Sequence, residues 1–268
     1  MTTKEKENLV YKDKNIIRIL PNELDMPIYR VFSKKWLIDA LTKKKNALVK
    51  PSMWKDPFEN FIFRSTAYTN NGVAIGFDSI RENFYGQCWT FNQEETDALW
   101  RIYSPDKDGF RVKTTIRKMF DSFYDLSHVF ALVSFFVGKI KYETEANIKK
   151  YFEDPNNLKK YIFDSAGNGH AETLLIKRME FKHENELRFV FLADKSWYDT
   201  NLDSYEFPID INYHFEEILA DPRMDEISST FFSDSMEEIK ELGYTNSIEK
   251  STLYQIPNLN LRLDIDVS

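Results

Sequence analysis

Two glutamates and an arginine alternate along a short β-favouring stretch, where Glu184, Glu186 and Arg188 are each two positions apart. Alternate side chains of an extended strand point to the same face, so the three would form one charged row. Such a row is costly inside a protein unless it is solvated or used for chemistry. It is therefore either a charged ladder on a solvated sheet face or a pair of carboxylates placed for catalysis.

Two more stretches carry polar residues among apolar ones. Tyr29 and Arg30 lie in a β-favouring segment at residues 28–32. An arginine there either faces outward to solvent or faces inward and needs an anion, for which its planar fork suits a phosphate or a carboxylate. Thr90 lies between two aromatic residues of a third segment, which places it on the opposite strand face from both.

Trp100 and Tyr103 are three residues apart in a predicted helix at residues 94–103. This spacing puts both on one helix face. A pair of aromatic rings on one face either belongs to the core or stacks on a planar ligand ring.

Metal and nucleophile chemistry has little support. The four histidines are scattered, the single cysteine, Cys88, has no nearby histidine, and no Gly-x-Ser-x-Gly sequence occurs. We therefore expect no metal site and no hydrolase triad. The sequence also lacks the glycine-rich phosphate loops of Rossmann and Walker proteins, which makes those two nucleotide folds unlikely candidates.

The elements that must position these residues do not alternate regularly. This favours an α+β fold, a single domain with mixed or antiparallel sheets flanked by helices, over a doubly wound α/β sheet. A helix is expected after Ser33, and others near Phe215 and at residues 94–103, 114–126, 146–152, 157–164, 171–182 and 236–242. Strands are expected at residues 28–32, 72–77, 86–91, 109–113, 130–137, 139–142 and 186–192, just beyond Phe207, and as a final pair near Leu253 and Leu261.

Composition and charge set limits on function. The chain has 268 residues, of which 42% are hydrophobic, enough for a core, and its net charge is −7. Residues 1–60 hold 13 basic and 8 acidic residues, whereas residues 201–268 hold 4 and 15. This is a poor pattern for a general nucleic-acid binder, although a basic rim (Lys43, Lys44, Lys45, Lys50, Lys55) could still face an anion. No stretch approaches the ~20 apolar residues of a membrane span and no leader is evident, so we expect a cytoplasmic protein without a membrane partner.

Several short motifs occur in an order that resembles the bacterial and phage family DUF2971. The resemblance covers residues 27–256 and implies one domain there, with an N-terminal extension at residues 1–26 and a C-terminal strand or tail at residues 257–268. The matching motifs are Tyr29-Arg30, Asp56-Pro57-Phe58-Glu59, Cys88-Trp89-Thr90, Leu99-Trp100-Arg101-Ile102-Tyr103, Asp108-Gly109-Phe110, Val137-Gly138-Lys139-Ile140-Lys141-Tyr142, Glu184-Asn185-Glu186-Leu187-Arg188, Ile218-Leu219-Ala220-Asp221-Pro222 and Ser251-Thr252-Leu253-Tyr254.

A more remote resemblance suggests an activity. An arginine on an early strand, a Ser/Thr-centred strand and a later Glu-x-Glu look like the Arg–Ser/Thr–Glu arrangement of ADP-ribosyltransferases, and Arg30, Thr90, Glu184 and Glu186 stand in that order. The resemblance implies NAD as co-substrate and a macromolecular acceptor, either RNA, DNA or protein. Toxins and phage-defence effectors have this fold, so an antitoxin or a sensor is an expected partner.

The same resemblance assigns roles to the candidate residues. Glu186 would stabilise the positive charge that develops on the ribose, and Glu184 would act on the acceptor. Thr90 would position Glu186. The NAD-binding residues would be Tyr29 and Arg30, with Arg30 on the pyrophosphate, and Trp100 or Tyr103 as a cover for the nicotinamide.

Two other classes of function remain open. A metal-dependent nuclease would combine Asp56 and Glu59 with Glu184, Glu186 and Arg188 around Mg²⁺. A non-catalytic module would instead dock a partner through the acidic residues 201–268, and its glutamate row would be solvated.

Overall fold

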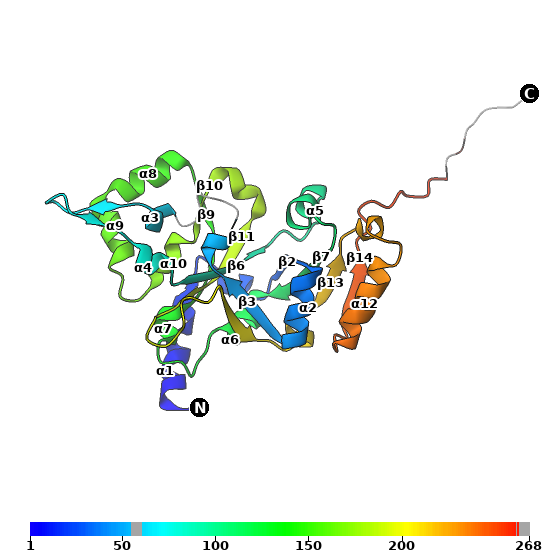
Figure 1. Cartoon of the computed structure of the whole chain (residues 1–268), viewed down its shortest axis with the longest axis horizontal. Coiled ribbons are helices and arrows are strands. Elements are labelled where there is room, and N and C mark those ends of the chain that lie inside the picture. The colour runs from blue at the N-terminus through cyan, green and yellow to red at the C-terminus, as the bar shows by residue number, and fades with distance from the viewer. Residues whose placement is uncertain (55–60, 261, 263–268) are drawn as a thin grey trace, which may run out of the picture.

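The computed structural model describes residues 1–54, 61–260 and 262. Its main sheet has ten strands within these residues, eight of them in one continuous order (Figure 1). That order is β1 (Ile16–Ile17), β8 (Phe135–Lys139), β11 (Glu186–Leu192), β6 (Phe84–Thr90), β2 (Pro27–Ser33), β7 (Gly109–Thr115), β13 (Glu217–Ala220) and β14 (Ser247–Lys250).

The sheet is mixed. Its outermost pairs on this path, β1 with β8 and β13 with β14, are parallel, and the strands between them pair antiparallel. β3 (Lys45–Val49) joins β6, and β12 (Ser204–Pro208) pairs with β3. Two small sheets pair β9 (Lys141–Glu143) with β10 (Ile176–Arg178) and β4 (Ala67–Tyr68) with β5 (Ala74–Ile75). The predicted α+β class with mixed sheets flanked by helices is confirmed.

Helices cover both faces of the main sheet. Figure 1 shows α8 and α9 near one end of the molecule and α12 beside β14 at the other. The helices are α1 (Thr3–Lys12), α2 (Lys34–Lys43), α3 (Phe61–Arg64), α4 (Asp78–Arg81), α5 (Asp97–Tyr103), α6 (Ile116–Phe123), α7 (Ala131–Ser134), α8 (Glu145–Glu153), α9 (Pro155–Ile162), α10 (Asn168–Thr173), α11 (Ile211–His214) and α12 (Phe231–Glu241), with five 3₁₀ turns, η1 (Asp13–Asn15), η2 (Pro21–Glu23), η3 (Pro51–Met53), η4 (Met179–Glu184) and η5 (Met224–Glu226).

Alternation along the strands divides the apolar side chains between two cores. Trp89 and Leu187 face the larger core, which α2, α6 and α12 cover, whereas Phe84 and Val190 face a smaller one against α3 and α10. Helix α6 buries its residues 116, 119, 120 and 123, the i, i+3, i+4, i+7 stripe of an amphipathic helix.

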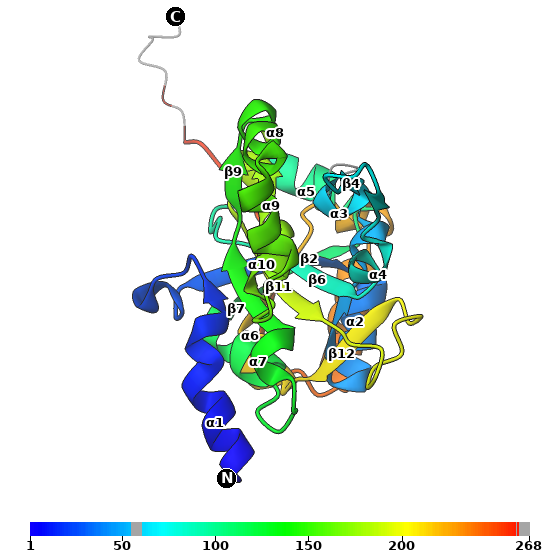
Figure 2. The same ribbon diagram turned by 90° about the vertical axis from the view of Figure 1, so that its left-hand side faces the viewer.

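The N-terminal segment is built into this fold. The Asn15 side-chain amide is buried and donates to the carbonyls of Leu132 and Phe135, at 3.0 and 2.8 Å, while β1 extends the sheet beside β8. Figure 2 shows α1 lying along α7 and reaching out from the body of the molecule. Residues 1–26, predicted to be an extension, therefore contribute a strand to the main sheet.

Some predicted elements differ from the structure because tertiary contacts outweigh local preference. The expected strand at residues 130–137 begins as α7, whose carbonyls Asn15 binds, and only then becomes β8. The expected helix at residues 171–182 is interrupted after α10, since residues 176–178 pair in parallel with β9. The expected strand near Leu253 is a turn, and Leu261 lies outside the described residues.

Candidate active site

One row of residues crosses three strands of the main sheet. In the antiparallel register Glu186 of β11 lies opposite Thr90 of β6, and Thr90 lies opposite Tyr29 of β2. Directly opposed residues share a sheet face, so the row lies on the face opposite Trp89 and Leu187. Three segments singled out in the sequence therefore meet at the same end of the β6–β11 pair, where β6 ends and β11 begins.

Glu186 is buried, with only 5% of its surface exposed. Its Oε1 accepts a hydrogen bond from Arg188 Nε at 2.6 Å, and its Oε2 accepts from Lys177 Nζ at 3.1 Å and Arg188 Nη2 at 3.2 Å. Arg188 is itself fully buried and stacks on Trp54, with its guanidinium 4.5 Å from the ring centre. The interpretation of this row as a ladder on a solvated face is therefore wrong.

Glu184 reaches the same place from outside the strand. It is the last residue of η4, and Asn185, with φ of 45°, turns the chain before β11 begins. Lys177 Nζ lies 2.6 Å from Glu184 Oε2, so one ammonium bridges both carboxylates. The expectation that Glu184, Glu186 and Arg188 lie along one extended strand is wrong, although the two carboxylates do meet.

Lys177 is a residue of this candidate site that no sequence pattern singles out. It lies in β10, within the stretch predicted as a helix, and only the pairing of β10 with β9 brings it to the glutamates. No spacing rule relates a lysine seven residues before Glu184 to a carboxylate pair when the intervening chain forms a 3₁₀ turn.

The surroundings shift the pKa values of Glu184 and Glu186 in opposite directions. Burial alone would raise the pKa of Glu186, but the charges of Arg188 and Lys177 and hydrogen bonds from Arg188 and Cys88 outweigh it and hold the pKa at about 2. Burial raises the pKa of Glu184, and Lys177 only partly offsets this while the charge of Glu186 adds to it. Near neutral pH Glu186 is thus firmly ionised, and Glu184 is the member of the pair that takes up a proton more readily.

Thr90 stabilises the turn before β11, and its hydroxyl binds backbone groups there rather than the Glu186 carboxylate. Its Oγ1 donates to the Glu184 carbonyl oxygen at 2.6 Å and accepts from the Asn92 backbone N–H at 3.0 Å. The Asn92 side-chain amide donates to the carbonyl of His183 at 2.8 Å. Thr90 acts on the carboxylate pair through the backbone at Glu184.

Arg30 faces inward, as the anion-binding interpretation requires. Its Nη1 donates to the Cys88 carbonyl at 2.6 Å, and its guanidinium lies 5.3 Å from the centre of the Phe32 ring. Burial lowers the pKa of Arg30, while the charges of Cys88 and Glu186 oppose that change. Among the described residues no hydrogen-bond partner reaches the buried Nε.

Tyr29 is buried beneath another arginine. The guanidinium of Arg111 lies 3.9 Å from the centre of the Tyr29 ring, and its Nη2 donates to the carbonyls of Asn92 and Gln93 at 2.7 and 2.5 Å. Tyr29 therefore supports the segment that joins β6 to α5 and makes no open surface for a cofactor.

Trp100 and Tyr103 do not share one accessible face. Trp100 is fully buried and its indole N–H donates to Glu95 Oε2 at 2.9 Å, so it cannot cover a ligand ring, whereas Tyr103 is 48% exposed. Burial and then the charges of Glu184 and Glu186 raise the pKa of the Tyr103 hydroxyl, which lies within electrostatic range of the carboxylate pair. Of the two aromatic residues, only Tyr103 is placed to cover a ligand.

The alternative sites gain little from the structure. Asp56 and Glu59 of the nuclease hypothesis lie outside the described residues. In the described part of the chain no group of three or more His, Cys, Asp or Glu side chains gathers as a metal site, and Lys177 supplies the cation between Glu184 and Glu186. Two cavities, of about 730 and 590 Å³, are lined by other residues.

Charge segregation along the chain is largely neutralised in three dimensions. Lys43 and Lys45 of the basic rim both pair with Glu206, and Lys50 donates to the carbonyl of Thr200 at 2.6 Å. Lys55 lies outside the described residues. The acidic C-terminal region likewise pairs with cations of earlier segments, including Lys118–Glu216, Lys113–Glu217, Lys107–Glu226 and Lys34–Glu238. Within the described residues, no helix combines the length and the apolar character that crossing a bilayer demands.

Comparison with known proteins gives one family and one remote structural likeness. DarT of Thermus sp. 2.9 in complex with NAD⁺ aligns with 85% of this chain and 96% of its own at 10% identity and a TM-score of 0.37. The same protein in complex with ADP-ribosylated ssDNA aligns with 88% of this chain and 97% of its own at 11% identity and a TM-score of 0.38. No curated protein matches the chain. Residues 99–189, which hold Tyr103, Lys177 and both glutamates, match the family described as "Protein of unknown function (DUF2971)", and this confirms the resemblance drawn from the sequence over that part of the chain.

Proposed function

We propose that the protein is an ADP-ribosyltransferase-like enzyme that transfers ADP-ribose from NAD to a macromolecule. One observation supports this most: Glu184 and Glu186 come from separate elements and meet through the shared Lys177 ammonium, and the charge of Glu186 contributes to the pKa shifts of both Arg30 and Tyr103. Thr90 lies opposite Glu186 on one side and opposite Tyr29, the neighbour of Arg30, on the other, which agrees with the Arg–Ser/Thr–Glu order of the sequence.

The reaction would break the bond between nicotinamide and ribose. Nicotinamide leaves with the bonding electrons, positive charge develops on the ribose, an acceptor nucleophile attacks the same carbon and its proton is lost to a base. An ionised carboxylate fixed beside the ribose stabilises that charge more in the transition state than in the ground state. Glu186 suits this role because its pKa of about 2 keeps it ionised.

Glu186 can reach the ribose 2′-hydroxyl only if one of its contacts gives way. The Lys177 ammonium is 3.1 Å from Glu186 Oε2 but 2.6 Å from Glu184, so it retains a partner when a hydroxyl replaces it on Glu186. Glu184, whose raised pKa suits proton transfer, would receive the acceptor's proton. Arg30 would donate to the pyrophosphate, and Tyr103 would cover the nicotinamide and exclude water.

The roles of a toxin or anti-phage effector, of a cytoplasmic location and of an antitoxin or sensor partner belong to the same proposal. DarT, in the complexes named above, holds NAD⁺ and ADP-ribosylated ssDNA. For this chain the labelled-NAD experiment assigns the acceptor class, since Lys43 and Lys45 of the basic rim pair with Glu206 within the protein.

Labelled NAD tests the proposal directly. The purified protein is incubated with it and a cell lysate, and label is followed on protein, RNA and DNA. Glu184→Gln is the main variant, because Glu184 is less buried than Glu186, and Glu180→Gln, an exposed residue of the same 3₁₀ turn, is its matched control. We expect transfer by the wild type and by E180Q, at least ~100-fold less transfer by E184Q, and no effect of EDTA. Absence of any NAD consumption would contradict the proposal, and EDTA-sensitive cleavage of nucleic acid would favour the nuclease.

A further inference from the structure

Arg223 binds the C-terminal end of α5. Its Nη2 donates to the carbonyl oxygens of Trp100 and Ser104 at 2.9 and 2.8 Å, in addition to the backbone N–H groups of Ser104 and Lys107 that these two carbonyls already accept. Only 7% of Arg223 is exposed. Tyr103 lies between Trp100 and Ser104 in the sequence, so any movement of this helix end moves Tyr103 as well.

Asp221 orients the arginine. Its Oδ1 accepts from Arg223 Nε at 3.0 Å and its Oδ2 accepts from Nη2 at 2.7 Å, and Asp221 is completely buried. The Asp221 backbone N–H donates to the carbonyl of Gly109, which anchors the turn to β7. A bidentate, buried pair of this kind fixes the guanidinium plane more firmly than a single contact would.

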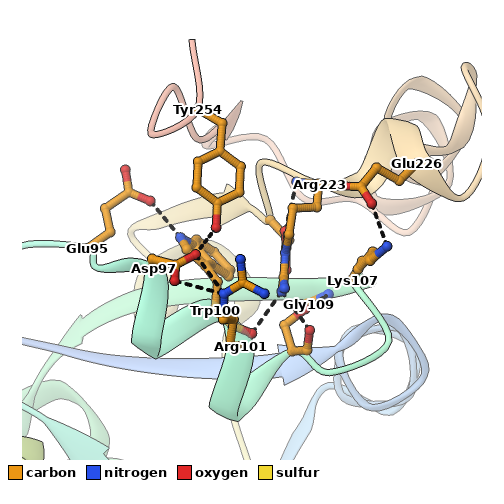
Figure 3. Close-up of polar contacts among 11 residues, drawn as sticks. Glu95, Asp97, Trp100, Arg101, Lys107, Gly109, Arg223, Glu226 and Tyr254 are labelled. Carbon is orange, nitrogen blue, oxygen red and sulfur yellow. Dashed lines mark hydrogen bonds and ion pairs between the residues drawn. The ribbon is translucent and has the colours of Figure 1, made fainter. Parts of the chain in front are cut away.

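Tyr254 contacts the same helix beside Arg223 (Figure 3). Its hydroxyl donates to Asp97 at the start of α5, and the exposed Arg101 pairs with Asp97 within the helix at 2.7 Å. Glu95 accepts from the Trp100 indole. The motifs at residues 108–110, 218–222 and 251–254, which the proposed chemistry does not use, therefore come together around α5.

The other end of this unit contacts the glutamate turn. Asn92, in the connection from β6 to α5, donates to the carbonyls of His183 and Glu184, and Arg111 holds the carbonyls of Asn92 and Gln93. α5 is thus tied to the Glu184 turn through its entry segment and to the Asp221–Arg223 turn through its exit.

We propose that Arg223 is a positioning residue that sets the place of Tyr103 against the Glu184 and Glu186 carboxylates. This inference rests on the proposed function, in which Tyr103 covers the nicotinamide. If Arg223 acts through Tyr103, its loss lets water compete with the acceptor and does not simply slow every product.

The ratio of free to transferred ADP-ribose tests this inference. Arg223→Lys keeps a cation beside Asp221 but lacks the planar fork through which Nε and Nη2 bind the Asp221 carboxylate while Nη2 reaches the carbonyls. The pair Asp221→Asn with Arg223→Gln removes both charges together and serves as a second variant. Arg101→Ala, which removes an exposed ion pair on the same helix, is the control.

We expect R223K and Y103A each to raise the ratio about tenfold, as small misplacements near reacting atoms do. In the Y103A background R223K should add no further change, while R101A should leave the ratio at the wild-type value. A purely structural role would lower both products together, or would multiply with Y103A, and either result would overturn the inference.

A second readout does not depend on NAD chemistry. 3-Fluorotyrosine at position 103 reports its surroundings by ¹⁹F NMR, and E184Q should shift its resonance in the wild-type background but not in R223K. If the wild type consumes no NAD, the proposed function fails, and this response still decides whether Arg223 positions Tyr103. An equal response to E184Q in both backgrounds would refute the positioning role.

Discussion

Replacing Glu186 by Gln measures how much the buried ion cluster contributes to the free energy of unfolding. The pKa of about 2 in the folded protein, against 4.5 for the unperturbed side chain, corresponds to about 3 kcal/mol at 1.36 kcal/mol per pKa unit. The variant also removes the carboxylate that the completely buried Arg188 binds through Nε and Nη2. Breaking a buried pair in this way typically costs about 3–5 kcal/mol, so we expect a loss of about 3 kcal/mol at pH 7.

The pH dependence has a definite sign. A carboxyl whose folded-state pKa is lowered stabilises the fold above its unfolded pKa and loses that contribution as pH falls through the folded value. The difference in stability between wild type and E186Q should therefore be full above about pH 5. It should shrink steadily as the pH falls from there toward 2.

Urea unfolding followed by tryptophan fluorescence provides the assay. Wild type, E186Q and the exposed-site control E180Q are compared at pH 7, 5, 4 and 3, and equal m-values verify that the same transition is measured. E180Q should stay within about 0.5 kcal/mol of wild type. The reasoning is refuted if E186Q is as stable as E180Q at pH 7, or if its deficit is the same at pH 3 as at pH 7.

Three more variants probe the same group. E184Q should remove the acidic limb of the pH–rate profile, because activity that needs ionised Glu184 rises with pH through its raised pKa; a limb that persists in E184Q would assign it elsewhere. Lys177→Met removes the cation shared by both carboxylates, which should raise the pKa of Glu184 further. The acidic limb should therefore move to higher pH in a profile of NAD turnover. An unmoved limb would contradict the bridging role. Tyr142→Phe removes the hydroxyl that accepts a hydrogen bond from the Glu186 backbone N–H at 2.9 Å. Denaturant unfolding should show a loss of about 1–3 kcal/mol in the free energy of unfolding. No loss would mean that water satisfies this N–H in the variant.

Local sequence patterns predicted the elements that carry the site. The apolar alternation around Arg30, Thr90 and Glu186 predicts the three strands that the structure contains as β2, β6 and β11. The helical spacing of residues 116–123 likewise predicts α6. Each signal is a period of two or 3.6 within one segment, and such periods depend on the segment alone.

Contacts between segments distant in the sequence determined the features of the site that local patterns did not predict. Lys177 is a site residue because β10 pairs with β9, and Trp100 is core because Arg223 and Glu95 bind its carbonyl and its indole. Neither contact has a local signature, since the partners are separated in sequence or belong to irregular turns.

The sequence by itself determined which residue types stand on which strand, and the family that residues 99–189 match. Only the tertiary structure decided that Glu186 is buried and ionised, that Glu184 approaches it from a turn, and that Trp100 is buried whereas Tyr103 is exposed. The physical reason is that burial and charge pairing depend on what packs across each face. Strand periodicity predicts which side chains share a face of the strand, but it does not predict whether water, a lysine or an arginine lies against that face.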